Sequence, residues 1–508
     1  MQIYVHLLSV IVFLPLIGGL IVLGLRNRTA VHFAALITTL ATFAASLIPV
    51  FYFNQELAGF QFEEYLPWIP AWGISYHLGI DGLSLFLLPL TGFLSVLAVL
   101  VSWKRIAVKE RAYFFSFLLL ETGMLGVFVS LDTILFYIFW EAMLIPMFLI
   151  IGIWGSANRR YAAIKFLIYT MAGSIFMLIA MIFMAVYTKQ YGGQLSFDIT
   201  VWTQLRLPEN IQYWLFTAFF IAFAVKVPIF PFHTWLPDAH VEAPTAGSVL
   251  LAGVLLKMGI YGILRFCFPL FPHAVIFFTP AILILGLIGL IYAAFVAFAQ
   301  TDLKKLVAYS SVCHMALIVI GIFAANQTGI KGGILQMVNH GLSTGALFIL
   351  VGALYERTGT RNMELMGGLA GRVPVLAAFF MIVTLSSIGL PGLNGFIGEF
   401  LLLLAAFKFK WWLGALSATT MILGAIYMLW MYQRVMFEKS RSTAEKSFGD
   451  FSIRENIVMI PVIIMFIFIG LYPSYFLNRL DKISATVLAN ISSNSTITST
   501  IAAGEKQK

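Results

Sequence analysis

Apolar runs of about 20 residues recur along this 508-residue chain, and they restrict its fold more than any other feature. Each run is long enough to cross about 30 Å of hydrocarbon as an α-helix. Because 61% of the residues are hydrophobic and only 10% are charged, a water-soluble core could not enclose the apolar surface. The chain is therefore predicted to cross a bilayer many times. Each crossing must be helical, because an open strand leaves backbone groups unpaired in lipid.

We expect an all-α membrane protein with about 14 transmembrane helices. The expected spans cover residues 4–25, 32–53, 82–103, 112–130, 132–155, 160–187, 212–237, 244–268, 275–299, 303–323, 331–356, 374–407, 411–434 and 455–475. The first run lacks the basic start and the small-residue cleavage site of a signal peptide, so we expect it to be a retained helix.

The lysines and arginines that lie outside the middle of the expected spans are distributed unevenly between the two sides of the membrane. If the N-terminus lies outside, 19 lysines and arginines fall on the inside and 10 on the outside. The inside group includes Arg105, Arg159, Lys165, Lys304, Arg361, Arg441 and Lys446. The outside group includes Arg265, Arg479, Lys482, Lys506 and Lys508. Because cytoplasmic loops carry an excess of basic residues, we expect a multi-pass protein of a bacterial inner membrane with both termini on the periplasmic side.

The net charge of +9 is thus explained by topology rather than by a nucleic-acid partner, since no basic patch with interleaved aromatic residues occurs. The two cysteines, Cys267 and Cys313, lie inside apolar runs, and no iron–sulfur or haem motif is present. The sequence also lacks a Walker A loop and a dinucleotide-binding glycine fingerprint. We therefore expect no metal or cofactor in this chain, and an energy source in an ion gradient or a partner subunit.

Two of the expected spans contain residues that interrupt helices. Span seven contains Pro228 and Pro231, and span twelve contains Pro391 and Gly392. Proline removes a backbone donor, and the freed carbonyls need protein or water partners inside a membrane, so such breaks usually line a cavity. The breaks lie five spans apart, and a repeat with an odd number of spans is inverted. Two inverted five-helix repeats are an arrangement typical of transporters; two unrelated proline kinks are the alternative.

This spacing divides the chain into four parts. They are spans one to three (1–111), the first inverted repeat of spans four to eight (112–268), the second inverted repeat of spans nine to thirteen (269–434), and the last span with the C-terminal tail (435–508). The two broken helices, seven and twelve, then occupy equivalent places in the two repeats.

Ionisable residues occur deep inside several spans, where each costs about 2.5–3.5 kcal/mol on insertion scales. They are Glu121, Glu141, Lys226, Lys257, His314, His340 and Glu399. A buried lysine loses hydration, which favours its neutral form, whereas a nearby carboxylate favours the charged form. Lys226 is therefore predicted to hold its proton when Glu141 is close and to release it when Glu141 withdraws. His314 can relay protons in either direction because histidine titrates near neutral pH.

A structural interpretation stays open beside each of these roles. The lysines and Glu141 can form buried ion pairs, and Glu121 can serve a supporting role. His340 and His233 can be core histidines hydrogen-bonded to helix carbonyls. Residues Asp238, His240 and Glu242 fall in an expected loop, and their spacing does not match a rigid set of metal ligands.

Long motifs around these residues resemble one known family. The motifs are His233-Thr-Trp-Leu-Pro-Asp-Ala-His240, Ala243-Pro-Thr-Ala-Gly-Ser248, Trp140-Glu-Ala-Met-Leu-Ile-Pro-Met147, Asp302-Leu-Lys-Lys-Leu-Val-Ala-Tyr-Ser310 and Leu390-Pro-Gly-Leu-Asn-Gly-Phe-Ile-Gly-Glu399. They are similar to the antiporter-like, proton-pumping subunits of respiratory complex I, over essentially the whole chain. Among the L, M and N types the chain resembles M, also called chain 4. Its length leaves no room for the extra helix of L, Glu399 replaces the lysine of L and N, and residues 74–84 are M-like.

The resemblance implies a role in an enzyme that passes electrons from NADH to quinone and moves protons. It implies that Glu141 modulates Lys226, that Lys257 and His314 form a central relay, and that Glu399 is the terminal proton donor or acceptor. It also implies that FMN, iron–sulfur clusters and quinone are bound by partner subunits and that this chain lies in the bilayer between L and N. The alternatives are a subunit of a multi-subunit Na⁺/H⁺ antiporter and a subunit of a membrane-bound hydrogenase.

Overall fold

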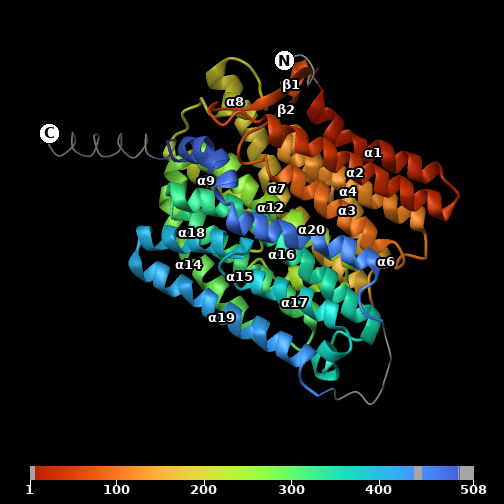
Figure 1. The fold of residues 1–508 in the computed structure, drawn as a ribbon. Helices are drawn as coiled ribbons and strands as arrows, with labels where there is room; N and C mark the ends of the chain where they lie inside the picture. The colour runs from red at the N-terminus through yellow and green to blue at the C-terminus, as the bar shows by residue number, and fades with distance from the viewer. Residues whose placement is uncertain (1–5, 440–448, 490, 492–508) are drawn as a thin grey trace.

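The computed structural model describes residues 6–439, 449–489 and 491. Within these residues the molecule is mostly helical, and 11 helices are long and apolar enough to cross a membrane. Figure 1 shows the long helices lying side by side, with a β-hairpin at one end. Four residues used in the topology prediction lie outside the described residues: Arg441, Lys446, Lys506 and Lys508.

The elements follow one another along the chain without a large interruption. The first are α1 (Leu7–Gly24), α2 (Arg28–Tyr52), β1 (Gln61–Ile69), η1 (Pro70–Trp72), β2 (Ile74–Ile80) and α3 (Leu87–Ser102). Next come α4 (Glu110–Val129), α5 (Thr133–Ala142), α6 (Leu144–Trp154), α7 (Arg159–Gly192), α8 (Ile199–Trp202), α9 (Glu209–Lys226), α10 (Trp235–Glu242), α11 (Thr245–Leu250), η2 (Leu251–Leu255), α12 (Leu256–Gly262), η3 (Ile263–Cys267) and α13 (Phe268–Leu270). The remainder are α14 (Pro272–Phe298), α15 (Leu303–Phe323), α16 (Gln327–Thr358), η4 (Met363–Leu365), η5 (Leu369–Gly371), α17 (Pro374–Ser387), α18 (Asn394–Phe409), α19 (Trp411–Met436), α20 (Ile453–Leu471), α21 (Ser474–Leu477) and η6 (Asn478–Leu480).

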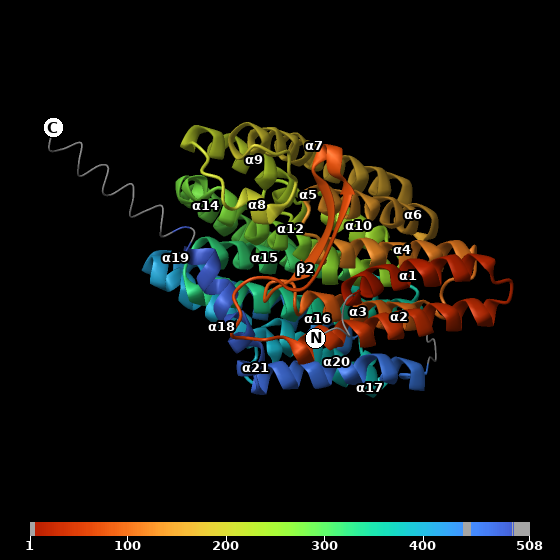
Figure 2. The same ribbon diagram turned by 90° about the horizontal axis from the view of Figure 1, so that it is seen from above.

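The all-α expectation is wrong between residues 61 and 80. Here β1 and β2 form a two-stranded antiparallel sheet in which Tyr65 pairs with His77. Polar residues such as Glu63, Glu64 and His77 interrupt these strands, so a search for apolar runs of span length passes over them. Figure 2 shows the hairpin extending across one end of the bundle towards α7.

Three expected spans differ from simple long helices. The expected span 82–103 begins late, because α3 starts at Leu87. The span 212–237 ends as a helix at Lys226 and resumes at Trp235, and the span 374–407 is interrupted between Ser387 and Asn394. Both interruptions fall at the predicted breaks.

The helices that carry most of the ionisable residues lie at the centre of the molecule. The apolar windows of Thr245–Leu270 and Gln327–Thr358 are 100% buried and that of Leu303–Phe323 is 94% buried, compared with 28% for Ile453–Leu471. Outer helices instead present large apolar side chains at the surface, as Ile168 and Ile179 of α7 do. A charged group in the middle of these helices, such as Lys257 of α12, is therefore enclosed by protein.

The two sides predicted from basic residues correspond to two ends of the bundle. Arg105, Arg159, Lys304 and Arg361 all line one cavity, while Arg265, Arg479 and Lys482 all line another. Two of these residues do not lie in surface loops as expected. Lys304 is buried in the first turn of α15, and Arg265 is buried in η3.

The hairpin is attached to α8 by a pH-sensitive ion pair. His77 Nδ1 lies 2.6 Å from Asp198 Oδ2, and His77 Nε2 lies 3.4 Å from Glu63 Oε2. Burial lowers the pKa of His77, but its contacts with Asp198 and Glu63 outweigh burial and raise that pKa. Burial raises the pKa of Asp198, and hydrogen bonds from His77 and Thr200 lower it by more. At pH values between the pKa of Asp198 and the pKa of His77, the imidazole is therefore positively charged and the carboxylate negatively charged.

We expect the hairpin to loosen as the pH rises. Because folding raises the pKa of His77, the ion pair stabilises the hairpin fully at pH values below the pKa of His77 in the unfolded chain. This stabilisation is lost as the pH rises through the pKa of His77 in the folded protein. The lowered pKa of Asp198 gives a stabilisation that is lost only in acid. Hydrogen exchange of residues 61–80, corrected for its intrinsic rate, should accelerate between about pH 6 and about pH 9. His77→Gln should remove this dependence. Equal protection at both pH values in the unsubstituted protein would contradict the prediction.

Candidate functional site

Lys226 ends α9, and its ammonium is enclosed by aromatic rings. Its side chain is 1% exposed, and Nζ lies 5.1 Å from the centre of the Trp140 ring and 5.9 Å from that of Phe166. Among the described residues it has no hydrogen-bond acceptor and forms no ion pair. Glu141, adjacent to Trp140, interacts with it electrostatically and has a buried oxygen without a donor. The two charges thus lie near each other without direct contact.

The break after Lys226 is stabilised by side-chain and backbone hydrogen bonds. The indole of Trp235 donates to the carbonyl of Val225 at 2.9 Å, and the amide of Ile229 donates to that of Ala224 at 2.9 Å. These bonds replace partners that the prolines remove from the helix. The helix can therefore end at Lys226 inside the protein without leaving these carbonyls unpaired.

Lys257 lies in the short helix α12, between the π-helical segments η2 and η3. Its ammonium donates to the carbonyl of Ala252 and lies 2.7 Å from Nδ1 of His340 on α16. Lys257 is fully buried, so this imidazole is its one side-chain partner among the described residues. The segment just before α12, η2, packs against α16, so Lys257 lies close enough for its side chain to reach His340.

A second pair continues from His340 towards α18. The rings of His340 and His314 have centroids 5.7 Å apart. Nδ1 of His314 on α15 lies 3.1 Å from Oε1 of Glu399, which also accepts a 3.4 Å hydrogen bond from Gln336. Lys257, His340, His314 and Glu399 therefore form a buried series of neighbouring groups, which we call the central line.

The break before α18 shapes the environment of Glu399. Gly389 has φ +76°, and a Cβ there would lie 2.9 Å from Oε2 of Glu399. Glycine is thus required both by the backbone and by the close approach of the carboxylate. The side chains of Ser343, Ser386 and Asn394 close the break by hydrogen bonds to one another, and the Asn394 amide also donates to the backbone carbonyl of Asn339.

Lys304 connects one end of the bundle with the interior. Asp302 caps α15, and Lys304 Nζ donates to the carbonyls of His240 at 3.1 Å and Ala243 at 2.6 Å. It also donates to the hydroxyl of Ser248 at 3.2 Å. The His240 ring stacks on Phe348 at 4.5 Å and interacts electrostatically with both Lys304 and Lys257. Lys304 and His240 therefore form a second set of buried groups, which lies close enough to Lys257 of the central line to interact with it electrostatically.

The remaining predicted residues lie apart from these contacts. Glu121 is fully buried beside Ser95 and forms no ion pair within the described part of the chain. The His233 ring packs against Phe230 and Tyr292. The expected loop at 238–242 is instead part of α10. There Asp238 pairs with Lys165 at 2.7 Å and Glu242 accepts from the amide of Asn158, so the two carboxylates point to different partners.

Sequence reasoning missed Lys304 and the polar neighbours of Glu399. A signal for the latter was available, because Gln336, Asn339, His340 and Ser343 recur at helical spacing in one apolar run and so share a face. Lys304 had no such signal, since a lysine beside Asp302 and Lys305 reads as a loop or helix end. The chemistry of the assembled groups is proton transfer, because amine, imidazole and carboxylate can each hold or release a proton.

Comparison with known proteins agrees with this geometry. A family model described as "NADH:quinone oxidoreductase/Mrp antiporter, TM" matches residues 130–424. NADH-quinone oxidoreductase subunit M of Rhodobacter capsulatus is 45% identical over 92% of this chain and 94% of its own length. A chain of respiratory complex I from Thermus thermophilus with bound NADH superposes with TM-score 0.87 and 32% identity, over 95% of this chain and 99% of that one. 

A chain of the Mrp complex from Dietzia sp. DQ12-45-1b superposes with TM-score 0.82 over 97% of this chain and 100% of that one. Its identity is 19%, so it shows a shared fold alone. The matched residues 130–424 include the whole central line and both helix breaks. From the family model and the subunit M relative, the chain belongs to the NADH:quinone oxidoreductase/Mrp antiporter family of multi-pass membrane proteins, as one of its subunit M (chain 4) members.

Proposed function

We propose that this chain is a proton-translocating membrane subunit of an NADH:quinone oxidoreductase. The observation that carries the proposal is the central line, in which Lys257, His340, His314 and Glu399 form a buried series across four helices, next to a helix break. Buried ionisable groups in a membrane protein are costly and mark ion pathways. The name of the subunit M relative supplies the enzyme in which such a path would work.

In this proposal Lys226 and Glu141 form the switch that feeds the central line. Lys226 would hold its proton when Glu141 comes into contact with it and release it when Glu141 withdraws. The arrangement seen here, with the two charges near each other but without direct contact, supports this switch because neither group is fixed by a hydrogen bond to the other. Lys257 and His314 pass the proton on, through His340, and Glu399 is the terminal donor or acceptor. Glu121 and His233 are assigned supporting roles.

We further propose the finer arrangement expected from the sequence. The chain crosses a bacterial inner membrane 14 times with both termini on the periplasmic side. Residues 112–268 and 269–434 form two inverted repeats, between an N-terminal part (1–111) and a C-terminal part (435–508). The matching breaks after α9 and α17 support the repeats. The chain lies between L-type and N-type subunits, and FMN, iron–sulfur clusters and quinone belong to partner subunits, so this chain performs no redox step itself.

The test is Glu141→Ala in membranes, after a native gel shows that the complex is assembled. We expect NADH-driven quinone reduction to fall by about tenfold or more, equivalent to at least about 1.4 kcal/mol of barrier, because the carboxylate opposite Lys226 is lost. Glu364→Ala, which removes an exposed carboxylate in η4, is the matched control and should be harmless.

The second candidate is a subunit of a Na⁺/H⁺ antiporter, because the description of the matching family also names the Mrp antiporter. It predicts the reverse pattern for Glu141→Ala. NADH oxidation would be unchanged while Na⁺/H⁺ exchange in the same vesicles is lost. That pair of results would overturn the assignment to an NADH:quinone oxidoreductase.

A further inference from the structure

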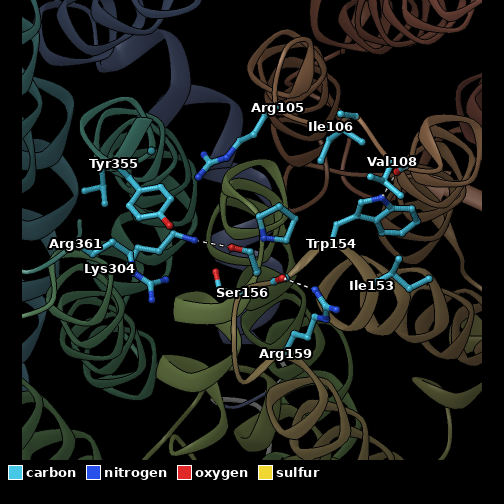
Figure 3. A pocket seen from close by; sticks show the side chains of 16 residues that line it. Arg105, Ile106, Val108, Ile153, Trp154, Ser156, Arg159, Lys304, Tyr355 and Arg361 are labelled. Carbon is cyan, nitrogen blue, oxygen red and sulfur yellow. Dashed lines mark hydrogen bonds between the residues drawn. The ribbon is translucent and has the colours of Figure 1, made fainter. Parts of the chain in front are cut away.

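One end of the bundle contains a cavity of about 530 Å³ with a strongly basic wall. Its charged lining comes from four separate elements, as Figure 3 shows. Arg105 follows α3, Arg159 begins α7, Lys304 lies in α15, and Arg361 follows α16. Basic groups from four distant parts of the sequence are thus gathered around one space.

The positive charge of this wall is only partly balanced. No carboxylate lines the cavity. Arg105 lies 3.7 Å from Glu356 and Arg361 lies 3.3 Å from Asp302, and both carboxylates lie outside the lining.

Arg159 and Lys304 pair with no carboxylate within the described ranges. Arg159 donates only to the carbonyl of Gly155, and Lys304 donates to neutral oxygens. Like charges gathered in this way repel one another, so the site favours an anion that would neutralise them.

Apolar side chains also line the cavity. They are those of Ile106, Val108, Ile153, Trp154 and Val351. The indole of Trp154 is held in place by its 2.7 Å hydrogen bond to the carbonyl of Val108. A ligand that fits both kinds of lining carries a compact anionic group next to a less polar part. The volume exceeds the needs of a single oxyanion and leaves room for such an extension.

We propose that this cavity binds a phosphate group, borne by an anionic phospholipid or free in solution. Arginine presents a planar set of donors that matches phosphate oxygens, and basic pockets between transmembrane helices suit lipid headgroups. Arg105 and Arg159 offer guanidinium donors from two separate elements, and Lys304 contributes positive charge. The proposal rests on this cavity alone and is independent of the proton-transfer role of the central line.

The experiment uses the purified complex that contains this chain, in detergent with phosphatidylcholine. Radiolabelled phosphatidylglycerol and radiolabelled inorganic phosphate are titrated separately, and the label retained per complex is measured. Arg159→Gln is compared with Arg160→Gln, which removes the same charge one residue further along α7 but does not line the cavity. Both arginines are exposed, so neither substitution disturbs the packed interior.

We expect Arg159→Gln to weaken one binding class by about tenfold and Arg160→Gln to leave it unchanged. Loss of phosphatidylglycerol binding alone assigns the site to a lipid headgroup, and loss of phosphate binding as well assigns it to the free ion. The double variant Arg105→Gln and Arg159→Gln should remove the class. Identical binding curves for both probes in wild type and all variants would overturn the proposal.

Discussion

Replacing Lys257 by methionine is expected to stop proton translocation in an assembled complex. Methionine keeps most of the volume of the side chain but removes the group that contacts Nδ1 of His340 at 2.7 Å. The central line then begins with an imidazole that has no donor beside it. NADH-driven acidification of inverted membrane vesicles should fall by at least about tenfold, the scale set by losing a proton-transfer group.

Met258→Leu provides the matched control, because Met258 is the buried neighbour of Lys257 and carries no proton. It should acidify the vesicles normally. Lys257→Arg tests charge separately from titration, since arginine stays protonated, and it should fail like methionine. Vesicles with Lys257→Met that pump at the wild-type rate would remove Lys257 from the proton path.

Replacing Arg265 by methionine is expected to lower the stability of the folded chain more than any other substitution proposed for it. Arg265 forms two hydrogen bonds to the carboxylate of Asp81, at 2.6 and 2.7 Å, and both residues are buried. The ring of Tyr261 and that of Phe60 complete its surroundings. Removing one partner leaves a buried charge without its counter-ion, which costs about 3–5 kcal/mol.

The measurement is the amount of assembled complex on a native gel and its unfolding midpoint in detergent. Asp81→Asn should also be destabilising. The double variant Asp81→Asn with Arg265→Met should lose less than the two single losses combined, because neither charge is then left alone. Additive losses would show that the two residues act independently and that the ion pair is not the source of their effect.

The sequence predicted the helical class and most span positions, because membrane crossing demands a long apolar run and little else. The agreement is closest at α15, whose bounds Leu303–Phe323 coincide with the expected span. The breaks in spans seven and twelve were equally readable, since Pro228 and Pro391 cannot continue a regular helix. The ionisable residues were found for the same reason: a charge is conspicuous in an apolar run.

The connections between these residues could not be predicted in the same way. Which side chain meets Lys257 depends on how the helix that carries it is placed beside α16, and a separation of 83 positions in the sequence gives no indication of it. The burial of Lys304 and Arg265 depends on carbonyls and a carboxylate from other elements. The hairpin was missed because its stability comes from pairing of β1 with β2 and from docking, not from a long apolar run.

The helix α12, which carries Lys257, lies between two π-helical turns. Segments η2 and η3 each contain hydrogen bonds that span one residue more than those of an α-helix. If the η2 turn moves along the chain past Lys257, the residues that it passes turn by about 100° about the helix axis, while the rest of the helix keeps its register. That rotation would carry the Lys257 ammonium off the His340 face while the ends of the helix stay anchored. A gate at this position therefore needs no hinge between domains.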